Sequence, residues 1–383
     1  MKILIFDPII SGHHLEYLHH LYMMAIKRPQ DSYVFVVHKD FEKRRILMDW
    51  PKAENIIFDT VPVVKEQKNS SIIELLKSSW RLCGALRYVV DKHNADRVFT
   101  NNIISFVPFA PLFLHNGVSV SGIIYHIYLY TQRNASMISR ALNKIKYYIM
   151  AHSRAFGKIF ILNDQESADA FNCEFRCNKF VGVPDPFVPI STESIFNFRE
   201  KYNIPRTAKV FAHFGGLAKR KGTLDVIQSL RLLDNEKRSN YWFVFAGAIK
   251  DDIKDSFNQM YDEIKDDCHI IVKDEFCSYE YLASLCQACD AILAPYHETD
   301  LSSGMFGYAS QFGKPLIAPS HGLIGKIVRQ YNLGVVLDSV NEKALSESYD
   351  KVVPDVCSIS KEYMEENNVE NFQEVISKNL CEI

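Results

Sequence analysis

The residues best suited to chemistry in this chain lie between positions 297 and 312. Apolar runs at residues 291–294 and 316–318 predict two short strands on either side of this segment. Pro295 closes the first run, and Gly313, Lys314 and Pro315 lead into the second. Between the runs, Ser302, Ser303 and Gly304 precede a helical pattern over residues 305–312. The order is therefore strand, polar loop, helix, turn, strand.

This order predicts a binding site for an anion. Ligands of parallel sheets bind at the carboxyl ends of the strands, so residues 297–304 are expected to line a cleft. The first turn of the helix presents unpaired N–H groups and the positive end of the helix dipole, and the small residues before it allow close approach. Phosphate is the expected ligand.

A second loop of the same kind lies earlier in the chain. Residues 209–213 read as a strand, residues 215–222 (GGLAKRKG) as a loop rich in glycine and basic residues, and residues 223–233 as a helix. Glycine permits tight turns and close backbone approach, and lysine supplies a cation. A solvated basic triplet at residues 219–221 is the plain alternative.

The elements that position these loops alternate along the whole chain. In the first half, strands are expected at residues 3–6, 33–37, 55–60, 97–100, 122–126 and 158–162, with helices between them such as residues 15–26 and 72–93. In the second half, strands are expected at residues 209–213, 242–246, 269–272, 291–294, 316–318 and 334–336. Such alternation favours parallel sheets with helices on both faces. The proline-rich segment 181–192 reads as the linker between two domains.

Length and composition agree with two globular domains. The 383 residues are 47% hydrophobic and 23% charged, and no apolar run approaches the roughly 20 residues that span a bilayer. The nine cysteines are scattered and odd in number, which favours reduced thiols and a cytoplasmic protein. Cys286 and Cys289 form one CxxC, but no second ligand pair follows and the pattern favours a buried helix face.

Charge is distributed unevenly. Residues 1–185 carry 23 basic and 17 acidic residues, and the remainder carries 21 and 29. Between residues 133 and 158 there are six basic residues and no acid, interleaved with apolar ones. This segment could lie on an anionic membrane surface, or it could be an ordinary helix with one buried face. We expect no nucleic-acid partner.

The loops resemble those of a known family, the retaining GT-B glycosyltransferases of family 4. In that family the first loop reads G-R-L-x-x-x-K-G, and residues 215–222 match this spacing with Gly216 in place of the arginine. A second signature, E-x7-E ahead of G-x-P-V-I-A, places its acidic positions at Asp300 and Tyr308. The resemblance covers nearly the full length. It implies two doubly wound Rossmann-like domains and a last helix that returns to the first domain.

The resemblance also implies roles for individual residues. Lys221 would bind the donor diphosphate, Asp300 would bind the donor sugar with Glu298 as its competitor, and His126 would lie beside the reacting centre. Tyr308 would either bond the ribose or pack within its helix. Either Lys219 or Arg220 would supply a second charge, or one cation suffices. The remaining donor-binding residues implied are Ser11, Gly12, Gly215, Gly216, Arg220, Ser302, Ser303 and Gly304.

The implied function is transfer of a sugar from a nucleotide-sugar donor to a saccharide or lipid-linked acceptor, with retention, in the synthesis of cell-surface polysaccharide or glycolipid. No D-x-D is present, so no metal and no further cofactor are expected. The expected location is the cytoplasm, with peripheral contact at the inner face of the membrane. The alternative is an inactive nucleotide-sugar-binding or partner subunit of the same fold. A nicotinamide dehydrogenase is disfavoured because the first loop, DPIISGHH, lacks G-x-G-x-x-G.

The expected domain boundaries follow from the linker and the last helix. Residues 1–187 would form the N-terminal acceptor-side domain, and residues 188–360 the C-terminal nucleotide-sugar-binding domain. Residues 361–383 would form the helix that packs back on the first domain.

Overall fold

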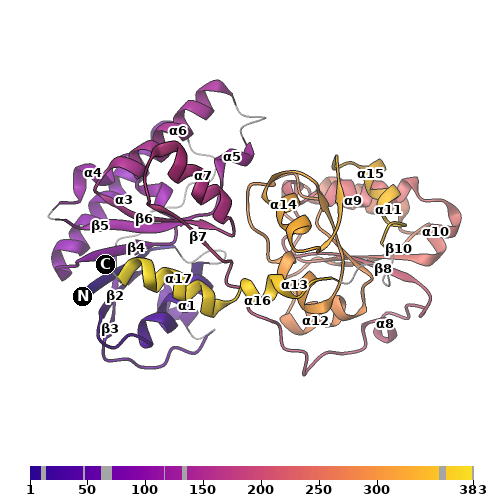
Figure 1. Cartoon of the computed structure of the whole chain (residues 1–383). Coiled ribbons are helices and arrows are strands. Elements are labelled where there is room, and N and C mark those ends of the chain that lie inside the picture. The colour runs from indigo at the N-terminus through magenta and orange to yellow at the C-terminus, as the bar shows by residue number, and fades with distance from the viewer. Residues whose placement is uncertain are drawn as a thin grey trace. The chain divides into compact units, whose positions relative to one another are not determined.

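Short, largely buried segments of branched and aromatic residues form the central strands of this protein, and the strands at the sheet edges are less buried. The first, β1 (Lys2–Asp7), is buried at five of its six positions, as expected for a parallel strand covered on both faces. The computed structural model describes residues 1–9, 14–45, 48–61, 71–115, 117–131, 136–352 and 359–381. The chain divides into two units, one of Met1–Pro186 with Asn368–Ile383 and one of Phe187–Asn367 (Figure 1).

The first unit contains a seven-stranded parallel sheet in the order β3-β2-β1-β4-β5-β6-β7. Its other strands are β2 (Ser32–Val37), β3 (Ile56–Thr60), β4 (Arg97–Thr100), β5 (Ser119–Ile124), β6 (Phe156–Leu162) and β7 (Phe180–Val183). Its helices are α1 (His14–Ile26), α2 (Phe41–Arg45), α3 (Ile72–His93), η1 (Ile103–Phe106), α4 (Ala110–Phe113), α5 (Tyr128–Thr131), α6 (Met137–His152), α7 (Gln165–Phe175) and α17 (Val369–Cys381).

The second unit contains a six-stranded parallel sheet in the order β10-β9-β8-β11-β12-β13. The strands are β8 (Lys209–Phe214), β9 (Tyr241–Ala246), β10 (His269–Lys273), β11 (Ala291–Leu293), β12 (Leu316–Pro319) and β13 (Gly334–Leu337). The helices are α8 (Phe198–Lys201), η2 (Lys219–Lys221), α9 (Thr223–Ser229), η3 (Leu230–Leu232), α10 (Asn235–Asn240), α11 (Lys254–Ile264), α12 (Tyr279–Ala288), α13 (Met305–Phe312), α14 (Gly322–Gln330), α15 (Glu342–Ser348) and α16 (Glu362–Glu366).

Both sheets have the strand order of doubly wound folds. In each, the first strand in sequence has the second on one side and a later strand on the other, which creates a switch point where ligands bind. The switch points lie between β1 and β4 in the first unit and between β8 and β11 in the second. The prediction of two Rossmann-like domains is confirmed.

Several boundaries differ from the prediction. The expected linker at residues 181–192 begins inside β7, which pairs with β6 and completes the first sheet. The chain passes to the second unit after Pro186 and returns after Asn367, so α16 belongs to the second unit and the returning segment begins later than residue 361. The helix expected over residues 223–233 is α-helical only to Ser229 and continues as the 3-10 helix η3.

The last helix of the chain does pack in the first unit. In Figure 1, α17 lies beside α1, which comes from the opposite end of the sequence. Phe372, Ile376 and Leu380 of α17 join the core formed by β1, β2 and α1. Burying three large apolar side chains contributes several kcal/mol, at about 1.5–3 kcal/mol each. The C-terminal segment is therefore an integral part of the first unit.

Candidate functional site

The two loops singled out from the sequence lie at the switch point of the second sheet. The first follows β8 and leads through Lys221 into α9, and the second follows the neighbouring strand β11 and leads into α13. The helix expected at residues 305–312 is confirmed as α13. The sheet therefore places Gly215, Lys221 and Ser303 at the same edge, although they are distant in sequence.

The loop after β8 is held by backbone packing that only glycine allows. A Cβ on Gly247 would lie 1.8 Å from the carbonyl oxygen of Gly215, and a Cβ on Gly222 would lie 2.1 Å from that of Pro295. Gly215, Gly222 and Gly247 also have positive φ. The ends of β9 and β11 thus enclose the loop from both sides and fix its path.

A buried histidine, which the sequence did not single out, fixes the start of the same loop. His213 is 1% exposed, and its Nδ1 lies 2.9 Å from the carbonyl oxygen of Leu293 in β11. A carbonyl only accepts, so Nδ1 carries the proton and Nε2 accepts from the Thr223 hydroxyl at 2.9 Å. Thr223 Oγ1 also accepts the backbone N–H of Ala218 at 3.1 Å. The chain of contacts joins β11, β8, the loop and α9.

Burial keeps His213 neutral. Desolvation lowers its pKa to about 4, with a smaller lowering effect from the Lys221 ammonium, while the hydrogen bond to Leu293 acts in the opposite direction. The imidazole therefore retains its acceptor nitrogen at neutral pH. In the sequence, the only signal for this role is the position of His213 directly before the glycine-rich loop.

The Lys221 side chain folds back over the loop. Its Nζ lies 3.0 Å from the position that a Cβ on Gly215 would occupy, and 5.4 Å from the centre of the Tyr296 ring. Tyr296 is 4% exposed, so its ring offers a fixed face to the cation. Within the described part of the chain, no carboxylate forms an ion pair with Lys221. This ammonium is therefore available for an anion bound above Gly215.

The loop after β11 connects this cation to the start of α13. The Ser303 hydroxyl donates to Tyr296 Oη at 3.2 Å and accepts the backbone N–H of Met305 at 3.3 Å. Gly304 is exposed, and a Cβ there would meet no atom within 4 Å. The helix start thus faces open space, as an anion site requires.

The two acidic candidates for the donor sugar differ in burial. Asp300 is 8% exposed, next to Thr299, whose carbonyl accepts the backbone N–H of Leu323 in α14. Glu298 is exposed. A fixed carboxylate loses less conformational entropy when it accepts a hydroxyl, which favours Asp300 over Glu298. Ser302 is half-buried in the same loop.

Tyr308 packs within the second unit. Its ring lies 5.8 Å from that of Phe187 and 5.5 Å from that of Phe214, the last residue of β8. A Cβ on Gly307 would lie 2.1 Å from the Phe187 ring, so this ring packs directly against the backbone of α13. The ring of Tyr308 is therefore packed, which is one of the two alternatives predicted from the sequence. A ribose contact by the hydroxyl stays a prediction.

The remaining basic candidate contributes through its backbone. The carbonyl of Arg220 accepts the N–H of His297 at 2.9 Å, which ties the two loops together, and its side chain is exposed. Gly216 and Lys219 are exposed as well. Lys221 is the basic residue of this loop whose side chain the fold positions.

The remaining candidates belong to the first unit. His126 follows β5 by two residues and is exposed, and its carbonyl oxygen accepts the Tyr147 hydroxyl at 3.4 Å. Its role at the reacting centre stays a prediction. Ser11 and Gly12 lie outside the described residues. Within the described residues, no group of three or more metal-ligating side chains occurs.

The CxxC pair lies at the end of α12. Cys286 and Cys289 are both fully buried, and burial raises the pKa of each thiol, that of Cys289 to about 12. Metal binding requires thiolates. The buried-helix interpretation fits these two residues.

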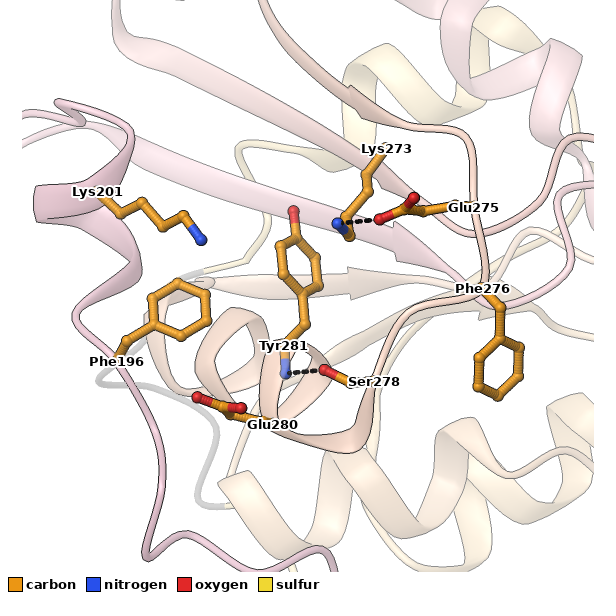
Figure 2. Close-up of a pocket in the computed structure, with 8 residues that line it drawn as sticks. All are labelled: Phe196, Lys201, Lys273, Glu275, Phe276, Ser278, Glu280 and Tyr281. Carbon is orange, nitrogen blue, oxygen red and sulfur yellow. Dashed lines mark hydrogen bonds and ion pairs between the residues drawn. The ribbon is translucent and has the colours of Figure 1, made fainter. Parts of the chain in front are cut away.

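A separate cavity of about 330 Å³ lies beyond the end of β10 (Figure 2). Lys273 pairs with Glu275 at 2.5 Å and lies over the Tyr281 ring, and Lys201 lies over the Phe196 ring. Lys273 already has a carboxylate partner, unlike Lys221. We therefore assign the anion chemistry to the Lys221 loop.

Comparisons with known proteins agree with this geometry. Residues 194–370 match the family model "Glycosyl transferases group 1". No curated protein matches the sequence. Similar solved structures include WaaG, a glycosyltransferase involved in lipopolysaccharide biosynthesis, at 14% identity and a TM-score of 0.68 over all of both chains. Anabaena Alr3699/HepE in complex with UDP-glucose has 15% identity and a TM-score of 0.67, covering 99% of this chain and 98% of that one.

A third similar structure is the UDP-forming α,α-trehalose-phosphate synthase of Burkholderia xenovorans, in complex with glucose-6-phosphate. It has 10% identity and a TM-score of 0.70, over 99% of each chain. Identities this low show a shared fold. In the described residues, no helix combines the length and apolar character needed to cross a membrane. The matched residues lie almost wholly in the second unit and the fold is shared over the whole length, so the chain has the GT-B fold, and its second unit is similar to the glycosyl transferases group 1.

Proposed function

We propose that this protein transfers a sugar from a nucleotide-sugar donor to a saccharide or lipid-linked acceptor. The observation that carries the proposal is the Lys221 ammonium, held over Gly215 and beside the open N-terminus of α13. The diphosphate leaving group develops negative charge as its bond to the sugar breaks. A fixed cation and oriented N–H groups stabilise that charge and cost no reorganisation during the reaction.

The donor phosphates would lie above the loop, with Lys221 as the main cation and the N–H groups before Met305 as further donors. Asp300 would accept hydrogen bonds from the sugar hydroxyls. His126 would act from the first unit at the reacting centre, with retention of configuration. Because Lys221 and the α13 N-terminus supply positive charge, we propose that no metal ion is required. UDP is the first nucleotide to test, since HepE was solved with UDP-glucose.

The acceptor and the location are part of the same proposal. On α6, Met137 is 84% exposed and Ile138 is 74% exposed, and Lys146 belongs to the basic run without acids. Apolar side chains next to lysines suit an anionic membrane surface. We propose peripheral contact at the inner face of the membrane, where a lipid-linked acceptor for polysaccharide or glycolipid synthesis would be found. Vesicle co-sedimentation with and without anionic lipid tests this contact.

A thermal-shift panel of UDP-, GDP-, ADP-, dTDP- and CMP-sugars tests the donor. A ligand present at 100 times its Kd adds about 2.7 kcal/mol of stability, which gives a measurable shift. Turnover is then followed as release of nucleoside diphosphate with saccharide and lipid-linked acceptors. Binding without any release would assign the alternative, a nucleotide-sugar-binding subunit. A flat panel would refute the donor site.

A further inference from the structure

The loop after β9 runs beside the loop that carries Lys221 and pairs with it. The N–H of Gly215 donates to the carbonyl of Ala246 at 2.9 Å, and the N–H of Leu217 donates to that of Ala248 at 3.0 Å. The N–H of Lys250 in turn donates to the carbonyl of Leu217 at 2.9 Å. These bonds extend the parallel pairing of β8 and β9 past the ends of both strands. The backbone of Lys250 is therefore fixed next to the glycines of the first loop.

The side chain of Lys250 lies over Gly216. Its Cε is 3.6 Å from the position that a Cβ on Gly216 would occupy, which is an ordinary van der Waals contact. Gly216, unlike Gly215, does not have a positive φ, so its backbone conformation does not require glycine. A long side chain that started from this Cβ would begin in contact with Lys250. Position 216 is the one at which the pattern G-R-L-x-x-x-K-G has arginine.

The charge of Lys250 is available for a ligand. Within the described residues, neither Lys250 nor Lys221 forms an ion pair with a carboxylate. Lys254, which follows in α11, does pair with Asp274, at 2.8 Å. Lys250 is also exposed, so its ammonium can bind an anion without giving up an ion pair.

Two cationic side chains therefore lie against neighbouring glycines of one loop. Lys221 Nζ is 3.0 Å from the Cβ position of Gly215, and Lys250 lies over Gly216. A diphosphate carries more than one negative charge, so one ammonium offsets only part of it. Cations fixed around the leaving phosphate stabilise its developing charge without reorganisation.

The two basic residues considered from the sequence for a second charge are placed differently. Lys219 and Arg220 lie in η2, and both are exposed. Arg220 contacts the loop after β11 through its backbone carbonyl. The contact with Gly216 comes from Lys250, which lies in another loop.

We propose that Lys250 is the second cation of the donor-phosphate site and takes the place of an arginine at position 216. Its ammonium binds the leaving phosphate from the loop after β9, while Lys221 binds it from the loop after β8. The inference rests on the proposed function, because the anion is the diphosphate of the nucleotide-sugar donor. It assigns this second charge to a loop that the sequence pattern does not include.

Calorimetric titration of the full chain with inorganic pyrophosphate, UDP and uridine tests the assignment. Lys250→Ala should weaken pyrophosphate and UDP binding about fivefold, the effect of one exposed and screened cation, and leave uridine binding unchanged. Lys250→Arg keeps the charge and should bind all three ligands like the wild type. Lys254→Ala is the matched control. It also removes one positive charge after β9, but from an ammonium that pairs with Asp274, so the affinities should stay within about twofold.

A second-site variant tests whether Lys250 replaces an arginine at position 216. Gly216→Arg combined with Lys250→Ala should restore the pyrophosphate affinity of the wild type. The backbone of Gly216 accepts a side chain, and truncation of Lys250 frees the space beside it. If the double variant bound pyrophosphate as weakly as Lys250→Ala, the two positions would not be equivalent and this part of the proposal would fall.

Three further outcomes would overturn the assignment of Lys250. The first is wild-type pyrophosphate affinity in Lys250→Ala, and the second is a loss of affinity confined to Lys219→Ala or Arg220→Ala. The third is an equal loss in Lys250→Ala and Lys254→Ala, because the effect would then be one of net charge. A wild type that bound neither pyrophosphate nor UDP would refute the donor site itself, whereas the other outcomes leave that site in place.

Discussion

Replacing Thr223 by valine should separate the loop of Lys221 from the strand that positions it. Valine has nearly the same shape as threonine, so the change removes one hydroxyl and little else. That hydroxyl, 0% exposed as part of Thr223, accepts the N–H of Ala218 and donates to His213. Its loss leaves the buried Nε2 of His213 and the half-buried N–H of Ala218 without this partner.

The magnitude follows from these two groups. An unsatisfied buried group costs about 1–3 kcal/mol, and the half-buried Ala218 N–H lies at the low end, so Thr223→Val should lose roughly 2–4 kcal/mol of unfolding free energy. For a domain of this size, about 2–4 °C of Tm is lost per kcal/mol. We expect the protein to stay folded with a lower Tm. If the loop then shifts, the anion loses its contact with Lys221, and a loss of about 1.4 kcal/mol of binding energy is tenfold in affinity.

Calorimetric titration with inorganic pyrophosphate, UDP and uridine measures this effect. Thr223→Val should bind pyrophosphate and UDP about tenfold more weakly and uridine as the wild type does. Thr223→Ser, which keeps the hydroxyl, should stay within threefold for all three ligands. A Thr223→Val variant that lost stability yet bound pyrophosphate normally would show that the hydroxyl supports the fold without positioning Lys221.

Four further predictions use the same assays. Lys221→Ala should lower turnover by about 10²- to 10³-fold and weaken UDP binding, whereas Lys314→Ala should change both little. If the two variants lost turnover and UDP affinity equally, Lys221 would not be the cation that binds the phosphates. Gly304→Ala should leave Tm within about 1 °C, since open space surrounds the added methyl, but should weaken UDP binding by blocking close approach. Unchanged UDP affinity would remove the α13 N-terminus from the site. Tyr308→Phe should keep Tm, because the ring contacts remain, and should lower UDP affinity severalfold if the hydroxyl binds ribose; identical affinity would leave only the packing role. His20 is buried, and desolvation lowers its pKa to about 4, so the unfolded chain binds a proton between pH 6.5 and 4 that the folded chain does not. The folded state should therefore lose up to about 1.4 kcal/mol of stability per pH unit as pH falls through that range. When the unfolding free energy from urea denaturation is plotted against pH, His20→Gln should show a shallower slope than the wild type. Parallel plots for the two proteins would contradict this prediction.

Errors in the sequence interpretation arose where local pattern and tertiary pairing disagree. β7 is a four-residue strand next to a proline-rich stretch, and the prolines predict a linker over residues 181–192. β5 begins at Ser119, earlier than the expected residue 122, because Ser119 and Val120 pair with Arg97 and Val98 of β4. The final helical pattern is split at Asn367, whose carbonyl accepts the N–H of Phe187. Each of these features depends on a segment distant in sequence.

The sequence by itself determined the order of the elements and which loops carry the chemistry. Apolar periodicity, glycines and the start of α13 are local properties, so they predicted two doubly wound units and placed Gly215, Lys221 and Ser303 in loops at carboxyl ends. Tertiary structure alone decided the partners of these groups. Tyr296 lies over Lys221, and Leu293 and Thr223 bind His213, only because neighbouring strands in a sheet come from distant parts of the chain. Strand order follows from the packing of whole helices on the sheet, and no local pattern of residues encodes it.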